Sequence, residues 1–597
     1  MTAETASAPA APRAEIRPPA TRLETALLVG VVLACAAAMS VNLADADLWG
    51  HVQYGRDTLN LGLQRTTSYS YTADGTTWTD HENLAEIVSA LVADAGGFRG
   101  LLLLKAVFGV VVIGLMLSRA WRTGVPLIPA ALTVLLVSIN LAYNWAVRPQ
   151  LFTYLCCALL LALFSWCFQG WEGGWRLPWP RSAAAMPEYS SRRMKALWLL
   201  PLLMIVWTNA HGGFAAGLCI ITAYLGCRAF EALLLGGWEA LGIIRRLGLM
   251  WLASVAATFI NPYGIGLHLW MRRVVSVPQA EIGEWHPPVM FDMLTIPFWI
   301  LLIVGGAALL LSRKPRDFTH LVVLAAILSQ ALSHQRHIPF VALLAGFWLP
   351  QHIASLLARF RGNAPEKSLE ESWSGLKLWQ KAGLAGGFAV AVLFLVGRLY
   401  TRLGDMPVEK HRFPVAALAY LAEQNPSGKL VVTYNWAQYA IAAVGPTNGE
   451  RDGLRVAYDG RYNTCYPQEV QDMHFDFILG DLPGCRWRSP DAPPIDGGRV
   501  LEHLRPDFVL LDRRQPHSVS TMQEHADAWT LLYQDGLAQV WGRTDTYGNP
   551  RSPRFIAPEQ RSISNAEQLG TVTWPALPPR AERAAAAAET RIAPNNS

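Results

Sequence analysis

The sequence predicts a mainly α-helical, polytopic membrane protein that ends in a small α/β domain. Only 16% of the 597 residues are charged, whereas an ordinary soluble domain has roughly 25%. Long apolar runs recur up to about residue 400, and a mixed segment with alternating strand and helix patterns follows. These observations exclude a conventional cytosolic enzyme.

A membrane span needs roughly 20 mostly apolar residues, somewhat fewer when one end is buried in a bundle. Eleven segments meet or approach that length, at 23–43, 100–118, 125–143, 151–168, 196–210, 213–234, 247–262, 294–311, 318–333, 338–355 and 382–399. The membrane domain therefore covers 23–400, with a long first outer loop at 44–99. Residues 1–22 are expected to form a disordered cytoplasmic N-terminus.

Basic residues set the expected orientation. With the N-terminus inside, the inner segments carry 20 Lys and Arg, and the outer segments before residue 400 carry seven. Because basic residues collect in cytoplasmic loops, the N-terminus is predicted inside and everything after residue 400 outside. The net charge of +5 is thus a topology signal, and a nucleic-acid partner is excluded.

The first outer loop opens with two carboxylates and a histidine. Asp45 and Asp47 follow the first span, and His51 shares a face with Asp47 if the segment is helical. This trio can bind a divalent cation such as Mg²⁺ or Mn²⁺, or leave one Asp as a general base; alternatively, an Asp only caps a loop helix. Further along the loop, His81 and Glu82 are candidates for substrate binding at the start of an amphipathic helix.

The other outer loops are short, and each carries polar or ionisable residues, which are expensive at membrane depth and indicate a functional site. Arg148 and Arg336 suit bidentate binding of phosphate. Alternatively, each only snorkels, which places its charge in the headgroup region of the membrane. Tyr263 lies in a segment that is most simply a turn. His211 precedes two glycines, which suggest close backbone packing, so it either binds substrate or has only a structural role. Glu281 and Glu284 are either site carboxylates or the wet face of an interfacial helix. The candidate substrate-binding residues of these loops are Arg148, Gln150, Asn209, His211, Tyr263, Glu284, Arg336 and His337.

Residues 403–545 are predicted to form a small extracytoplasmic α/β domain. A helix at 414–423 and strands at 429–434, 454–458, 508–511 and 538–541 are expected. Cys465 and Cys485 are the only cysteines in this domain, and an oxidising compartment would permit a disulfide between them. Residues 546–597 are rich in Pro, Ala, Arg and Ser and are expected to be a disordered tail.

Four segments resemble those of a group of bacterial polytopic membrane proteins: D-x-D-x-W-x-H at Asp45 to His51, R-P-Q at Arg148 to Gln150, N-x-H-G-G at Asn209 to Gly213, and D-G-R at Asp459 to Arg461. Over about residues 23–400 the topology also resembles the GT-C superfamily of glycosyltransferases. That resemblance implies a polyprenyl-phosphate-linked sugar donor and a catalytic or metal-binding Asp in the first outer loop. The second acidic motif of some GT-C enzymes is not evident, so Glu281 or Glu284 would have to take its place.

The resulting hypothesis is a hexosyl- or pentosyltransferase at the outer face of the bacterial cytoplasmic membrane, in cell-envelope polysaccharide or glycoconjugate synthesis. Its partners would be membrane lipid, the lipid-linked sugar and a glycan, lipid or protein acceptor. Asp45 or Asp47 would deprotonate the acceptor, Arg148 and Arg336 would bind the donor phosphate, and His51 and His211 would orient substrate. The alternative is a non-enzymatic scaffold, or a glycan or lipid transport component, with a ligand-binding outer domain.

Overall fold

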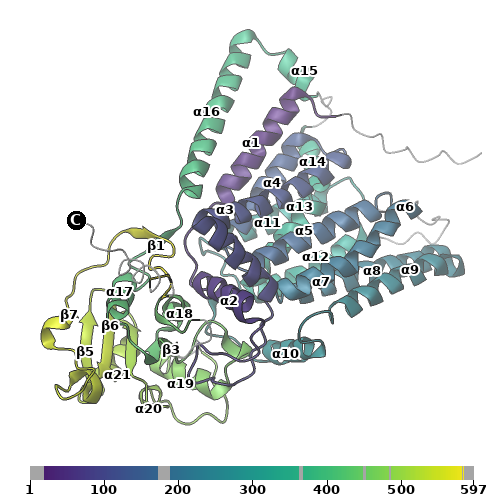
Figure 1. Cartoon of the computed structure of the whole chain (residues 1–597). Coiled ribbons are helices and arrows are strands. Elements are labelled where there is room, and N and C mark those ends of the chain that lie inside the picture. The colour runs from purple at the N-terminus through teal and green to yellow at the C-terminus, as the bar shows by residue number, and fades with distance from the viewer. Residues whose placement is uncertain are drawn as a thin grey trace, which may run out of the picture.

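The computed structural model describes residues 19–171, 189–361, 368–447, 452–482, 486–580 and 582–583. A bundle of apolar helices is joined to a C-terminal α/β domain, and the loop after the first helix lies between them (Figure 1). Most of the expected disordered N-terminus, 1–22, lies outside the described residues, although helix α1 already begins at Arg22.

Each of the eleven predicted apolar segments contains a helix. The apolar helices are α1 (Arg22–Met39), α3 (Asn83–Arg122), α4 (Leu127–Ala142), α5 (Gln150–Cys167), α7 (Leu199–Ala210), α8 (Phe214–Gly236), α9 (Leu241–Ala257), α11 (Ile296–Leu311), α12 (Phe318–Ser333), α13 (Ile338–Trp348), α14 (Pro350–Arg361) and α16 (Leu378–Leu403). Among the described residues, five helical segments are long and apolar enough to cross a membrane, or six if the bent pair α13 and α14 is one span. The chain is a membrane protein, and the count of eleven spans stays a prediction.

Short helices α6 (Ser191–Met194), α10 (Ile265–Ser276) and α15 (Leu369–Ser374) connect the longer ones. Helix α3 contains both the amphipathic helix predicted in the first loop and the second predicted span. The two parts meet at Gly97, whose φ of 58° lies in the left-handed region that a glycine adopts without steric cost. The helix begins at Asn83, with Glu82 as its N-cap.

The α/β domain is built on a mixed sheet. Its strands are β2 (Gly428–Val432), β3 (Leu454–Val456), β4 (Phe508–Asp512), β5 (Trp529–Gln534), β6 (Ala538–Arg543) and β7 (Ser562–Ile563), and in the described chain six strands follow the order β3-β2-β4-β6-β5-β7. Strands β3, β2 and β4 are parallel to one another, whereas β6 runs antiparallel to β4 and β5. The helices of this domain are α17 (Val415–Glu423), α18 (Ala437–Val444), α19 (Gln468–Leu479), α20 (Arg499–Glu502) and α21 (Pro516–Glu524).

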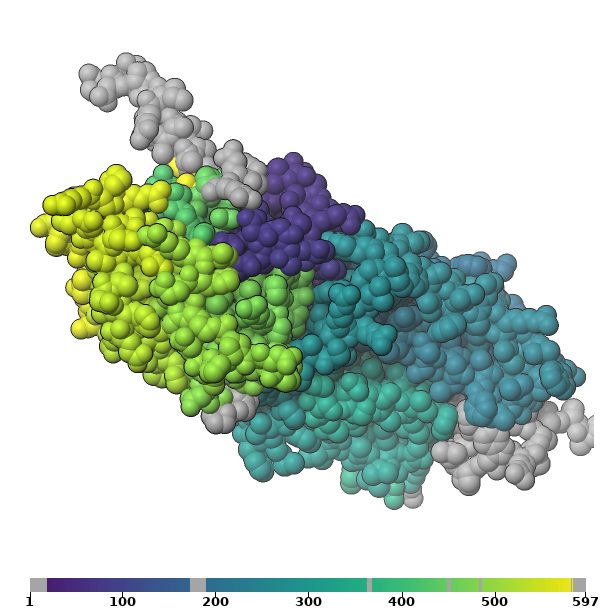
Figure 2. Space-filling view, turned by 90° about the horizontal axis from the view of Figure 1, so that it is seen from below, coloured from purple at the N-terminus to yellow at the C-terminus, as the bar shows by residue number. Residues whose placement is uncertain are grey.

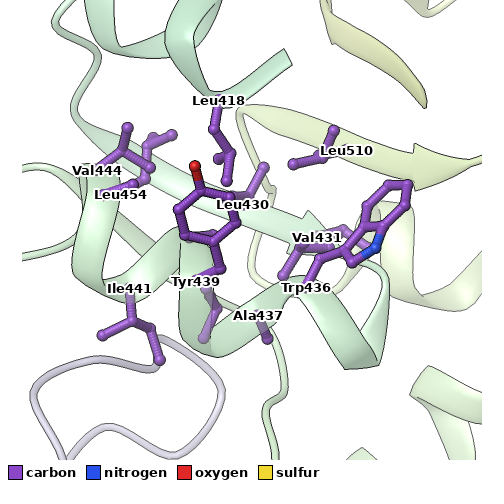
Figure 3. Packing of buried hydrophobic residues seen from close by; sticks show 14 of the residues in the cluster. Leu418, Leu430, Val431, Trp436, Ala437, Tyr439, Ile441, Val444, Leu454 and Leu510 are labelled. Atoms are coloured by element: carbon purple, nitrogen blue, oxygen red, sulfur yellow. The ribbon is translucent and has the colours of Figure 1, made fainter. Parts of the chain in front are cut away.

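Figure 3 shows how α18 covers this sheet: Trp436 and Tyr439 pack with Leu430 of β2 and Leu510 of β4. Burying each such side chain contributes roughly 1.5–3 kcal/mol relative to leaving it exposed. The same core continues into the first loop, because Trp49 of α2 (Leu48–Leu61) stacks on Tyr439 with ring centroids 4.6 Å apart. The α/β domain and the first loop therefore form one packed unit.

Backbone pairing also joins the first loop to the domain. The Val456 amide donates to the Tyr69 carbonyl (2.9 Å) and the Tyr71 amide donates to the Val456 carbonyl (3.2 Å), which extends the edge strand β3. Viewed from below, the dark purple first loop lies directly against the green α/β domain (Figure 2). The loop at 44–99 is thus a fixed part of the structure.

The predicted disordered tail is wrong for residues 546–580. Strand β7 pairs with β5, and β8 (Thr571–Thr573) pairs antiparallel with β1 (Pro407–Glu409). Trp574 is buried in the same core as Trp49. The composition of this segment suggested disorder, but its few β-branched and aromatic residues are enough to anchor it on the domain.

Candidate active site

A cavity of about 1060 Å³ lies between the helical bundle and the α/β domain. Eleven of the thirteen predicted site residues line it: Asp45, Asp47, His51, His81, Glu82, Arg148, Gln150, His211, Glu284, Arg336 and His337. They come from segments up to about 290 residues apart in the sequence. The predicted convergence of these loop residues on one side of the bundle is therefore present in the structure.

Arg148 is bound by three carboxylates. Its Nε donates to Asp45 Oδ1 (2.6 Å), Nη2 to Asp47 Oδ2 (2.7 Å) and Nη1 to Glu284 Oε1 (2.9 Å). Burial lowers the pKa of Arg148, but the three carboxylates outweigh it and raise that pKa well above its ordinary value. If all four groups are ionised, the cluster carries two net negative charges.

The local backbone aims both aspartates at this guanidinium. Asp45 Oδ1 accepts a hydrogen bond from the Asp47 amide (3.0 Å), and Asp47 is the N-cap of α2 although its side chain makes no capping bond. The Asp47 carboxylate therefore stays available to the cavity. Burial raises the pKa of Asp47 even though Arg148 opposes the shift, which makes Asp47 a stronger base than an ordinary aspartate.

Glu82 lies among three histidines on the cavity wall. Its Oε1 is 3.3 Å from His211 Nε2 and 3.6 Å from His81 Nε2, and its Oε2 is 3.8 Å from His51 Nδ1. The Gly213 amide donates to His211 Nδ1 (2.9 Å), so the neutral ring carries its proton on Nε2, facing Glu82.

Burial controls the protonation of Glu82, His81 and His211. Burial is the main cause that raises the pKa of Glu82 to about 7 and lowers the pKa of His81 to about 4. Burial also lowers the pKa of His211 well below its ordinary value. At neutral pH the two histidines are therefore uncharged donors, and Glu82 lies close to its titration midpoint.

The α/β domain closes the cavity behind Asp47 through the Asp459–Gly460–Arg461 turn. A Cβ on Gly460 would lie 2.7 Å from Asp47 Oδ1 and 2.5 Å from Gln438 Nε2, so only glycine allows this approach. Arg461 holds the turn in place by donating to Asp459 through Nε (2.9 Å) and Nη2 (2.7 Å).

Arg461 also fastens the domain to the first loop. Its Nη1 donates to Thr67 Oγ1 (2.8 Å), and its guanidinium lies 4.8 Å from the centroid of Trp78 and 5.1 Å from that of Tyr54. Cation–π contacts of this kind are stronger when the charge is removed from water. The D-G-R segment is therefore a structural joint that also forms one wall of the cavity.

Arg336 differs from the other arginines of the cavity. Among the described residues the lining contains Arg148, Arg336, Arg412, Arg461 and Arg514, and each except Arg336 has a carboxylate within 4.0 Å. The Arg336 guanidinium instead lies over the Trp285 ring, 4.3 Å from its centroid. It is thus the lining guanidinium whose charge is open to an anion.

Two predicted site residues support loops and do not line the cavity. The Asn209 amide donates to the carbonyls of Ile205 and Ile260, both at 2.8 Å. The Tyr263 hydroxyl accepts a hydrogen bond from the Asp80 amide (3.0 Å). Glu281 is likewise absent from the cavity lining, and it accepts a hydrogen bond from the Trp487 amide (2.7 Å).

The predicted metal trio Asp45, Asp47 and His51 does not form. Arg148 occupies the two aspartates, and His51 Nδ1 contacts Glu86 Oε1 at 2.9 Å. The residues present around Asp45 and Asp47 therefore do not fit a divalent cation. The predicted Cys465–Cys485 pairing cannot be followed, because Cys485 lies outside the described residues; Cys465 itself is buried.

Sequence reasoning missed the contribution of the α/β domain. The missed lining residues follow the carboxyl ends of parallel strands: Thr433, Tyr434, Asn435, Trp436 and Gln438 after β2, and Asp512, Arg514 and Gln515 at the end of β4. In open α/β sheets, ligands bind at this edge. That rule, applied to the strands expected at 429–434 and 508–511, could have identified them.

No protein-family model and no curated protein sequence matches the chain. Among solved structures, it is similar to the oligosaccharyltransferase of Archaeoglobus fulgidus tethered with an acceptor peptide, with a TM-score of 0.51 and 11% identity over 82% of this chain and 69% of that one. ArnT from Cupriavidus metallidurans gives TM-scores of 0.48 in the apo state and 0.47 with undecaprenyl phosphate, each at 12% identity over 87% of this chain and 97% of that one. The likeness to the oligosaccharyltransferase concerns the fold alone, and it agrees with the membrane architecture that the sequence predicted.

Proposed function

We propose that this protein is a GT-C-type glycosyltransferase that uses a polyprenyl-phosphate-linked sugar at the outer face of a bacterial cytoplasmic membrane. One observation carries the proposal: a carboxylate cluster and a guanidinium without a carboxylate partner share one cavity, in a fold similar to that of a membrane oligosaccharyltransferase. The orientation, with the N-terminus inside, follows from the distribution of basic residues.

Arg336 is the residue we assign to the donor phosphate. Arg148 was the other candidate, but its three nitrogens already donate to carboxylates. A phosphate beside Arg148 would also meet the negative charge of Asp45, Asp47 and Glu284. Arg336 donates to no carboxylate in the described chain, and Glu284 and Glu82 act on it without forming an ion pair. A guanidinium left open in this way can stabilise the negative charge that develops on a leaving phosphate.

An apolar strip on one side of the cavity suits the lipid part of such a donor. Val41, Leu43, Tyr143, Val275, Met293 and Leu294 line the cavity and are each at least 37% exposed. They lie at or next to the ends of α1, α4, α10 and α11. An isoprenoid chain would bury these side chains, which a soluble sugar donor would leave in contact with water.

Asp47 is the residue we assign to the acceptor. Its carboxylate takes the proton of the acceptor hydroxyl while the acceptor oxygen forms a bond to the anomeric carbon of the sugar. The bond between that carbon and the phosphate oxygen breaks, and its electron pair leaves with the lipid phosphate beside Arg336. The raised pKa of Asp47 favours proton transfer to it from a weakly acidic hydroxyl.

The test is sugar transfer by the purified full-length protein in proteoliposomes. The donors are undecaprenyl-phosphate-linked hexoses and pentoses with radiolabelled sugar, and a bacterial membrane extract supplies acceptors. We expect transfer by the wild type, a loss of about 100-fold or more in Asp47→Asn, and a loss of about 100-fold in Arg336→Met.

Glu281→Gln is the matched control, because it removes a carboxylate three residues from Glu284 and keeps an oxygen that can accept from Trp487. It should transfer at the wild-type rate. A well-folded Asp47→Asn protein that transfers as fast as the wild type contradicts the proposal. Movement of the lipid across the vesicle without cleavage of the donor would instead indicate a transporter.

A further inference from the structure

His51, Glu82 and Glu86 place three metal-binding side chains at one point of the cavity wall. One ligand atom from each lies within 4.8 Å of the others, and the His51 Nδ1 to Glu86 Oε1 distance is 2.9 Å. Ligand atoms about 2.1 Å from one ion are themselves separated by roughly 3–3.5 Å. Small side-chain rotations would bring the three atoms to that spacing.

The buried carboxylate of Glu86 gives independent evidence for a ligand at this point. Glu86 is 2% exposed, and its Oε2 has no hydrogen-bond partner in the described structure. A buried carboxylate oxygen without a partner costs several kcal/mol unless a positive charge or a donor meets it. This atom therefore points to a missing cation or proton.

The charge of the surroundings supports a cation. Asp80 and Glu82 both act on Glu86 as like charges, and the Asp80 carboxylate lies close enough to share a proton with Glu86 when no cation is bound. Within the described ranges, no Lys or Arg forms an ion pair with Asp80, Glu82 or Glu86, and the ion pairs of Glu82 and Glu86 there are with histidines. Three carboxylates so close together cannot all ionise without a counter-charge.

We propose that His51, Glu82 and Glu86 bind a divalent transition-metal cation, of the Mn²⁺ or Zn²⁺ class. Imidazole is a good ligand for such ions, whereas Mg²⁺ and Ca²⁺ prefer sites made entirely of oxygen. His211 Nε2 lies 3.3 Å from Glu82 Oε1, within range to support a metal-ligating carboxylate. Three protein ligands leave positions open toward the cavity for water or substrate oxygen.

The site is distinct from the Asp45, Asp47 and His51 trio that the sequence predicted. Only His51 is common to both, because Arg148 replaces a cation at the two aspartates. The two assignments therefore make opposite predictions for variants of Asp45 and of Glu82. The inference concerns binding and holds whether or not the protein transfers sugar.

The test uses the full-length protein in detergent after treatment with EDTA. Binding of Mn²⁺ is followed by the loss of the free-ion electron paramagnetic resonance signal, and Zn²⁺ is used as a competitor. We expect one Mn²⁺ per chain, displaced by Zn²⁺ and not by millimolar Mg²⁺. Glu82→Gln and Glu86→Gln should each weaken binding by about 10-fold or more.

Asp45→Asn is the matched control and should bind Mn²⁺ as the wild type does. His51→Gln serves as a third ligand variant if a glutamine in place of the buried Glu86 prevents folding, which gel filtration would reveal. Two results would overturn the inference: no Mn²⁺ or Zn²⁺ bound by the wild type, which would mean that the carboxylates share protons, or binding lost in Asp45→Asn and retained in Glu82→Gln.

Discussion

Replacing Arg148 with methionine should destabilise the protein, and by more at high pH than at low pH. The change removes the counter-charge of Asp45, Asp47 and Glu284 and keeps a similar side-chain volume. Breaking a fully buried ion pair costs roughly 3–5 kcal/mol. The four side chains here are 19–31% exposed, so water compensates part of that loss and we expect about 3 kcal/mol at pH 8.

The pH dependence follows from the remaining carboxylates. Burial already raises the pKa of Asp47, and Arg148 is the main group that opposes the shift. Without Arg148 the pKa of Asp47 rises further. A carboxyl group with a raised pKa in the folded state stabilises the protein at low pH, and this stability is lost as pH rises through that pKa. The destabilisation should therefore fall to about 1 kcal/mol at pH 5.

The measurement is the free energy of unfolding by detergent titration at pH 5 and pH 8. Adding Glu284→Gln to Arg148→Met removes one of the uncompensated charges and should recover about 1 kcal/mol at pH 8. A loss below 1 kcal/mol, or the same loss at both pH values, would refute the view that the guanidinium holds three ionised carboxylates together.

Three further predictions concern the cavity wall. Gly460→Ala puts a methyl group against Asp47, so it should lower the rate of sugar transfer by about 10-fold or more while the melting temperature falls only modestly, a cost of about 1–3 kcal/mol; an unchanged rate would show that the turn does not restrict Asp47. Because the pKa of Glu82 is raised from 4.5 to about 7, the EDTA-treated protein should lose about 3 kcal/mol of unfolding free energy as pH rises from 4.5 to above 7, and Glu82→Gln should abolish that component in the same titration. Arg461→Lys keeps the charge but cannot bind Asp459 through two nitrogens, so limited proteolysis should cleave the first loop faster than in the wild type; equal cleavage would contradict the role of Arg461 as a joint.

The sequence indicated the helices and most strands because each depends on local patterns. The apolar runs, and strands such as 508–511, contain their own signal in hydropathy and β-branched residues. The tail was misread for the same reason. Its Pro and Ala content outweighed the short Thr571–Thr573 strand, and pairing with Pro407–Glu409 is a tertiary contact that no local pattern contains.

The sequence identified most residues of the site, but it did not reveal which of them form ion pairs with one another. Polar residues in the predicted outer loops identified eleven of the lining residues. Which of them meet depends on how loops far apart in the sequence pack. Arg148 and Glu284 are 136 positions apart, so nothing in the spacing revealed that Arg148 is neutralised or that Arg336 remains open. Glu86 was missed because it looked like part of an ordinary amphipathic helix.

The position of the donor phosphate tests the central claim most directly. A density map of the full-length protein with a polyprenyl-phosphate analogue would show it. We predict the phosphate in the cavity beside Arg336, with the Arg148 ion pairs to Asp45, Asp47 and Glu284 kept, and with the lipid chain along Val41, Tyr143 and Leu294. A phosphate outside the cavity, or one bound by Arg148 with its carboxylates displaced, would contradict the account.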